Sequence, residues 1–355
     1  MKKVVCILVF LIAFSFLLTG CSKKQETKSE SIETETSVAT VKKPEEMVYA
    51  IVTKSEGNRY NELEAEGYQK VIEEFGATCI VAHPKSTTAM EQVRLIEKLI
   101  EEDVDAITIA ANDADALDDV LKKAQEEGIL ITTVDSNVNP DYTSLFINQV
   151  DTKTLAQTLL DAVYDISGGS GQWAILSASS MAPNQTAWIK QMKDLMKEDE
   201  KYKKLDLVEI AYGDDLDQLS KDQATAILQT YQDLKVICAP TTVGCRAAAE
   251  VVADTETKCL VTGLGLPSEM DDYIADEGPC PYMYIWDSEQ VGELAAYATL
   301  ALMKDELVGM EGHSFTAGDL GKFTVQENED GGAEIVAGML LRINKNNIDH
   351  WKNVM

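Results

Sequence analysis

Two adjacent carboxamides, Asn184 and Gln185, follow the apolar run "WAILSA" and stand directly before a helix-like segment. A side-chain amide offers two hydrogen-bond donors and one carbonyl acceptor. This combination suits vicinal hydroxyl groups, because hydroxyls both donate and accept. The alternative is loop or helix N-cap chemistry, which asparagine favours. The pair predicts recognition of a polyhydroxylated small molecule, with a helix start as the structural alternative.

Two charged residues end other apolar runs of the chain. Lys54 follows "AIVT", and Asp135 follows "ITTV". In a shared cleft the two side chains could pair, and each could polarise hydroxyl groups of a neutral ligand. A hydrogen bond with a charged partner contributes about 1.5–3 kcal/mol, against about 1 kcal/mol for a neutral pair. For either residue alone, a solvated loop charge is the alternative.

Further candidates stand at or near other strand ends. Pro240 offers a free carbonyl acceptor, and Thr242 offers a backbone N–H or a hydroxyl. Aromatic rings can pack on the C–H faces of a sugar, although core packing explains such residues equally well. The aromatic candidates are Tyr60, Trp188 and Trp286.

The case for catalysis is thin. Asp287 follows Trp286 at a strand end and could line the ligand pocket; it could also form a carboxylate pair with Asp135, as a glycosidase requires. The chain contains no G-x-S-x-G elbow, no P-loop and no HExxH pair. Cysteine is present seven times, and without Cys6 and Cys21 of the N-terminal segment five remain, with no CxxC spacing. We therefore expect buried thiols, no metal site, no cofactor and no enzymatic activity.

The elements that must position these residues alternate regularly. Short apolar, β-branched runs are separated by segments with apolar residues at helical spacing, which is typical of parallel β-α-β units covered on both faces. The expected strands are 47–54, 78–84, 105–111, 129–136, 172–178, 207–213, 235–240, 258–265 and 282–287. Short β segments are expected in the tail, from residue 321 to 343.

This pattern predicts an α/β fold with two Rossmann-like, doubly wound domains and a ligand cleft between them. In such sheets, ligands bind outside the carboxyl ends of the strands, where the candidate residues stand. We expect crossings between the domains near residues 150, 286 and 320. The N-terminal domain would comprise 47–150 plus 287–320, and the C-terminal domain 151–286 plus 321–355.

The first 46 residues predict a targeting signal followed by a flexible tether. Two lysines precede the apolar stretch Val4–Leu18, which ends in "LTGC" at Cys21. A charged n-region and an h-region of this length indicate a signal peptide, residues 1–21, because a membrane span needs about 20 apolar residues. "LTGC" resembles a lipobox, in which the cysteine is lipidated; an uncleaved membrane anchor is the alternative. Residues 22–46 are rich in Ser, Thr, Glu and Lys and predict a flexible tether.

The formal net charge of −29 excludes nucleic acid and anionic membrane surfaces as partners. Membrane attachment is thus expected through the lipid anchor only.

Nearly the whole mature chain resembles the type I periplasmic sugar-binding proteins of ABC importers. Within them it is most similar to the LsrB-type autoinducer-2 receptors and the neighbouring rhamnose-binding proteins. The stretches that carry the resemblance are "EQVRLIEKLIEEDVDAITIAANDADALDDVLKKAQEEGILITTVDSNVNPD", "LFINQVD", "NQTAWI" and "APTTVGCRAAAE".

The resemblance implies a set of ligand-contacting residues. The lysine that ends the first strand in LsrB-type receptors falls on Lys54, and the aspartate of the D-S motif falls on Asp135. The receptors' Asp-Gln pair falls on Asn184 and Gln185, and their proline and alanine fall on Pro240 and Thr242. The departures are thus Asn for Asp and Thr for Ala. A threonine keeps the backbone N–H, whereas the asparagine removes a negative charge.

The function implied is a monomeric, extracytoplasmic, lipid-anchored receptor that delivers its ligand to ABC permease subunits. Lys54 favours autoinducer-2 in its hydrated furanosyl form, while asparagine at position 184 also fits a rhamnose-binding protein, which is the alternative. An enzyme acting on secreted sugars is a third hypothesis. A transcriptional repressor of the same fold is disfavoured because no helix-turn-helix precedes the first domain.

Overall fold

The computed structural model describes residues 42–338 and 340–355. The predicted signal peptide, its Cys21 and residues 22–41 of the predicted tether lie outside the described residues. The last tether residues, 42–46, are structured, which differs from the expectation. They include the 3₁₀ turn η1 (Pro44–Glu46), whose Pro44 carbonyl accepts a hydrogen bond from the Tyr49 hydroxyl at 3.1 Å.

The larger of two main sheets has seven strands in the order β13-β14-β5-β4-β3-β1-β2. Neighbouring strands are parallel except for β13 and β14. The bounds are β1 (Val48–Val52), β2 (Thr78–Ala82), β3 (Ala106–Ile109), β4 (Leu130–Val134), β5 (Phe146–Asn148), β13 (Gln326–Glu327) and β14 (Ala333–Val336).

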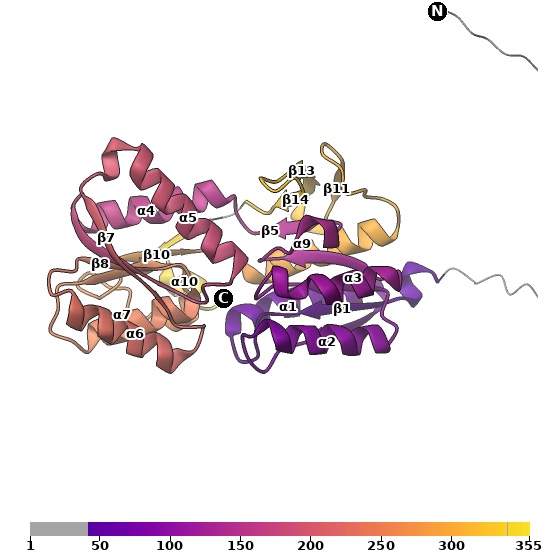
Figure 1. The fold of residues 1–355 in the computed structure, drawn as a ribbon, viewed down its shortest axis with the longest axis horizontal. Coiled ribbons are helices and arrows are strands. Elements are labelled where there is room, and N and C mark those ends of the chain that lie inside the picture. Colours follow the sequence, from indigo (N-terminus) through magenta and orange to yellow (C-terminus); the bar gives the residue numbers. More distant parts are fainter. Residues whose placement is uncertain (1–41, 339) are drawn as a thin grey trace, which may run out of the picture. The chain divides into compact units, whose positions relative to one another are not determined.

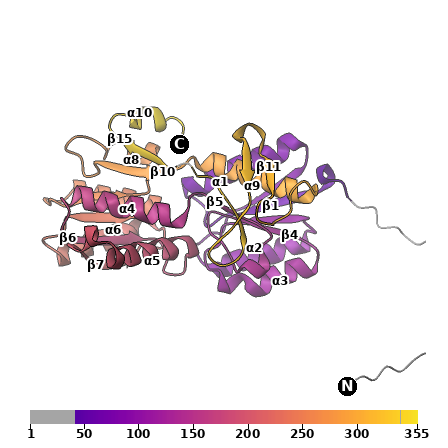
Figure 2. The same ribbon diagram turned by 90° about the horizontal axis from the view of Figure 1, so that it is seen from above.

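Helices cover both faces of this sheet, as continuous apolar strands require. One face carries α1 (Arg59–Phe75) and α9 (Ser288–Met303), and the other carries α2 (Ala89–Glu101) and α3 (Asp118–Glu126), as Figure 2 shows. The axes of α1 and α9 approach closely through two glycines. A Cβ on Gly292 would lie 1.9 Å from the Glu64 carbonyl oxygen, and one on Gly67 would lie 2.0 Å from that of Glu289.

The smaller main sheet has four parallel strands in the order β7-β6-β8-β9. Their bounds are β6 (Gly171–Ser177), β7 (Leu205–Tyr212), β8 (Val236–Ala239) and β9 (Leu260–Gly263). Figure 1 shows helices on both sides of the strands. The helices are α4 (Thr152–Ile166) and α5 (Pro183–Glu198) on one side, and α6 (Asp217–Thr230) and α7 (Thr242–Ala253) on the other.

Short elements complete the described chain. Two antiparallel pairs join β10 (Tyr282–Ile285) to β15 (Leu341–Asn344) and β11 (Ser314–Thr316) to β12 (Lys322–Thr324). The short helices are α8 (Pro267–Met270) and α10 (Ile348–Trp351), with 3₁₀ turns η2 (Asp115–Leu117), η3 (Pro140–Tyr142), η4 (Glu200–Tyr202) and η5 (Gly318–Leu320). All five cysteines of the described residues are free, and four of them are buried.

The predicted α/β class with parallel sheets is confirmed, and one detail is corrected. The third crossing lies after β14 and not near residue 320, because β14 extends the larger sheet: Glu334 pairs with Phe146 in parallel register. The other domain bounds stay a prediction.

In the part of the chain that the structure describes, no helix combines the length and the apolar character that crossing a membrane requires.

Candidate functional site

All six residues predicted to contact the ligand line one pocket, together with Tyr60, Trp188 and Trp286. The space between its lining residues is about 380 Å³, part of which is open to solvent. Its polar residues follow the carboxyl ends of β1 and β4 in the larger sheet and of β6, β7 and β8 in the smaller sheet. The strand-end rule of parallel α/β sheets thus brings together residues from both sheets.

A closed set of contacts joins three of these side chains. Lys54 Nζ lies 2.8 Å from Asp135 Oδ2 and donates to Asn184 Oδ1 at 3.0 Å. Asn184 Nδ2 donates in turn to Asp135 Oδ2 at 3.1 Å. We call Lys54, Asp135 and Asn184 the polar ring. It links loops of the larger sheet to the first turn of α5.

The ion pair within the polar ring is buried, since 9% of the Lys54 side chain and 5% of the Asp135 side chain are exposed. Removing one partner of a buried ion pair typically costs about 3–5 kcal/mol, because the other charge is left uncompensated. The polar ring is therefore sensitive to the loss of any member and well suited to exchange contacts with hydroxyl groups.

Asp135 is held in place by its backbone and by two further donors. Its φ of 58° lies in the left-handed region, which aspartate tolerates at some cost. The Tyr60 hydroxyl and Gln149 Nε2 each donate to Asp135 Oδ1 at 3.2 Å. These contacts fix the direction of the carboxylate.

The helix N-cap alternative for Asn184 is wrong in its simple form. Ala182 occupies the N-cap of α5, followed by Pro183 at the first helical position. Asn184 does accept the Gln185 backbone N–H at 2.8 Å. Its side-chain Nδ2, however, donates to Asp135 within the polar ring.

An aromatic wall closes another side of the pocket. The Tyr60 and Trp286 rings meet edge to face at 6.1 Å, and those of Trp188 and Trp286 at 6.3 Å. Trp286 Nε1 donates to the Tyr60 hydroxyl at 2.8 Å. These residues are buried and also line the pocket. They can therefore serve both of the predicted purposes, core packing and contact with a sugar face.

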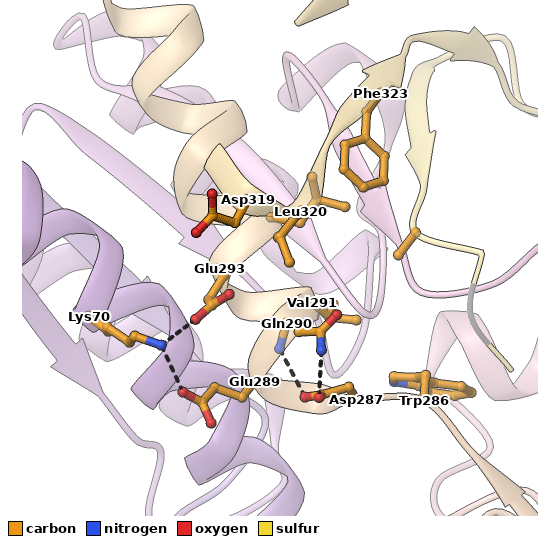
Figure 3. A pocket seen from close by; sticks show the side chains of 12 residues that line it. Lys70, Trp286, Asp287, Glu289, Gln290, Val291, Glu293, Asp319, Leu320 and Phe323 are labelled. Atoms are coloured by element: carbon orange, nitrogen blue, oxygen red, sulfur yellow. Dashed lines mark hydrogen bonds and ion pairs between the residues drawn. The ribbon is translucent and has the colours of Figure 1, made fainter. Parts of the chain in front are cut away.

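Asp287 does not reach this pocket, so the structure does not form the carboxylate pair considered for catalysis. It caps α9 by accepting the Gln290 backbone N–H at 3.1 Å. Figure 3 shows it in a neighbouring cavity near Lys70, Glu289 and Glu293.

Several lining residues were missed by the sequence analysis. They are Asn58, Asn61, Asp215, Thr241, Leu264 and Ile285. Asp215 follows the strand β7 closely, so the rule that found Lys54 and Asp135 could have found it too. Asn58 carries a different signal, as the N-cap of α1. Leu264 and Ile285 are apolar strand residues, and nothing in their type distinguishes them from the core.

Residues 49–307 match the family model described as "Periplasmic binding protein domain". A solved ABC transporter solute-binding protein from Clostridium phytofermentas with bound L-rhamnose is 47% identical. The match covers 87% of this chain and 99% of that chain, with a TM-score of 0.86.

Two other comparisons are weaker. LsrB from Clostridium saccharobutylicum in complex with AI-2 is 19% identical over 86% of this chain and 99% of that chain, with a TM-score of 0.79, which indicates a shared fold alone. The D-ribose/D-allose-binding protein of Pseudomonas aeruginosa is 31% identical over 127 residues. That match spans 35% of this chain and 37% of the relative.

One buried carboxyl behind the pocket has no partner. Glu64 on α1 is fully buried, and neither of its carboxyl oxygens makes a hydrogen bond with a described residue. Burial, followed by the nearby Asp135 carboxylate, raises the pKa of Glu64 well above its usual range, while Lys54 opposes this effect. Burial thus favours the protonated form of this side chain.

This burial predicts a pH-dependent stability cost that Glu64→Gln removes. An acid whose folded-state pKa is raised destabilises the fold progressively as pH rises from the unfolded-state value towards the folded-state value. Thermal unfolding between pH 4 and 8 should therefore show a stability difference that shifts in favour of Glu64→Gln as pH rises. The exposed Glu74→Gln on the same helix serves as control. A difference that stays constant across this range would contradict the buried neutral acid.

Proposed function

The chain belongs to the family of the periplasmic binding protein domain. From its 47% identity to the rhamnose-bound protein, we propose that its ligand is L-rhamnose or a close stereochemical relative. Members of the family are solute-binding transport receptors without enzymatic activity. The chain is accordingly a sugar-binding protein of an ABC transporter that works outside the cytoplasm.

The observation that carries the proposal is the polar ring beside an aromatic wall. The ring offers charged and amide groups to hydroxyls, and the rings of Tyr60, Trp188 and Trp286 offer an apolar surface to C–H groups. A 6-deoxyhexose presents both kinds of surface, because it carries several hydroxyls and one methyl group. Leu264 and Ile285 extend the apolar part of the lining.

The identity to the rhamnose-bound protein supports this ligand over autoinducer-2. At 47% identity over nearly the full length of that protein, the similarity extends beyond the fold. The similarity to LsrB, at 19%, supports a common fold and leaves the ligand open. In the sequence, Lys54 favoured autoinducer-2 over rhamnose. Our proposal places L-rhamnose first and autoinducer-2 second.

Autoinducer-2 stays the second candidate because of the polar ring itself. Lys54, Asp135, Gln185 and Pro240 stand at the positions implied by the resemblance to LsrB-type receptors, and all four line the pocket. The hydrated furanosyl form also carries vicinal hydroxyls, so the two ligands share much of their chemistry. The two candidate ligands favour different residues at position 184: asparagine fits a rhamnose-binding protein, whereas LsrB-type receptors have aspartate there.

We also propose how the receptor is placed and used. Lipid attachment at Cys21 would hold it at the outer face of the cell membrane through the tether. Closure around the sugar would present the loaded receptor, as a monomer, to the permease subunits.

The substitution Asn184→Asp separates the two ligands. It removes the amide that donates to Asp135 and places a second carboxylate beside it. Calorimetry should show L-rhamnose binding weakened by about 1–3 kcal/mol, since a buried acceptor loses its donor. If autoinducer-2 is the ligand, the change restores the residue found in LsrB-type receptors, and affinity should be equal or higher. Wild-type protein that binds autoinducer-2 but not L-rhamnose would overturn the first candidate.

The anchor is tested by Cys21→Ser. Stable membrane attachment needs two acyl signals, and a lipidated cysteine carries them on one residue. We expect the variant to appear in the soluble fraction or as unprocessed precursor. A mature-sized variant that still sediments with membranes would exclude lipidation at this residue.

A further inference from the structure

Asp215 stands between two cavities. It lines the pocket that contains the polar ring, and it also lines a neighbouring cavity whose other residues include Lys85, Thr87 and Arg246. Asn58 shares this double position from the larger-sheet side. The carboxylate is thus at the edge of the ligand pocket, where a bound sugar would meet the loop after β7.

The turn that presents Asp215 is fixed by its backbone. The Gly213 and Asp214 N–H groups donate to the Ser177 and Ala178 carbonyls at 2.8 and 2.9 Å. Gly213 has no space for a Cβ, which would lie 2.1 Å from Ser220 Oγ. The turn is therefore packed tightly against β6 and α6.

Asp214 and Asp215 both have left-handed backbones, with φ of 50° and 52°. Two successive non-glycine residues in this region are energetically unfavourable and persist only where the surroundings hold them. Such outliers concentrate at binding sites. Asp135, on the opposite side of the pocket, has the same backbone conformation.

The Asp215 carboxylate has one free acceptor. Thr241 Oγ1 donates to Oδ1, whereas Oδ2 makes no hydrogen bond within the described residues. Burial raises the pKa of Asp215, and the hydroxyl of Thr241 and the charge of Lys54 oppose this shift. Oδ2 is thus available to accept a hydrogen bond from a further donor.

We propose that Asp215 is a further specificity-determining residue that accepts a hydrogen bond from one hydroxyl of the bound sugar. This rests on the proposed function of the pocket. Asp135 and Asp215 would then both accept hydrogen bonds from the sugar, Asp135 on the side of the larger sheet and Asp215 on the side of the smaller sheet. In the same turn, the Asp214 carbonyl accepts a hydrogen bond from the Thr87 hydroxyl at 3.2 Å. This contact ties the position of the turn to a loop of the larger sheet.

The test is calorimetric titration of the full mature protein with L-rhamnose and with its 2-, 3- and 4-deoxy analogues. Asp215→Asn keeps the acceptor for Thr241 and tolerates the left-handed backbone, so the turn is retained. We expect this variant to bind L-rhamnose about 10- to 100-fold more weakly, because a charged acceptor is lost. One deoxy analogue should lose affinity relative to L-rhamnose in the wild type but not in Asp215→Asn.

Asp214→Asn is the matched control. It changes the neighbouring residue in the same backbone conformation, and its side chain lines neither cavity. We expect its affinities to stay within about twofold of the wild type. If Asp215→Asn also stays within twofold and loses affinity for every analogue as the wild type does, the role of Asp215 is overturned while the proposed function stands. If the wild type binds none of these sugars, both proposals fail together.

Discussion

The ion pair between Lys54 and Asp135 is the interaction on which the rest of the site depends. Two opposite charges lie 2.8 Å apart with almost no exposure to solvent. Removing them from water costs several kcal/mol per ion, so the pair persists only with additional hydrogen bonds. Asn184, Tyr60 and Gln149 supply these bonds. A sugar hydroxyl can take the place of any of these neutral partners, which makes a costly ion pair a suitable receptor.

The fold serves to bring these groups to one place. Parallel strands of both sheets end at the pocket, so side chains more than a hundred residues apart in sequence meet there. Close packing of α1 and α9, possible because Gly67 and Gly292 lack side chains, fixes the helix that carries Tyr60. Trp286 follows β10, and its Nε1 donates a hydrogen bond to the Tyr60 hydroxyl within the aromatic wall. The rigid support and the binding groups therefore belong to the same elements.

The alternation of apolar strands and amphipathic helices was sufficient to predict the class of fold and strand ends that meet at one pocket. It could not predict contacts that depend on distant pairing. The place of β14 beside β5 is set by register between segments some 190 residues apart, and a four-residue apolar run carries no sign of its partner. Asp287 looked equivalent to Asp135, yet it caps α9 and turns away. Asp215 follows β7, so the strand-end rule could have found it, but its left-handed backbone and its contact with Thr241 are visible only in the structure.

The central claim is that Lys54 and Asn184 act as one unit in holding the ligand between the two sheets. A double-mutant cycle in L-rhamnose affinity, with Lys54→Met, Asn184→Ala and the double variant, tests it most directly. Residues that share one hydrogen-bond network show coupling of about 0.5–3 kcal/mol. We predict that each single change weakens binding at least tenfold and that the double change costs less than the sum. Additive losses, or unchanged affinity in either single variant, would contradict the account.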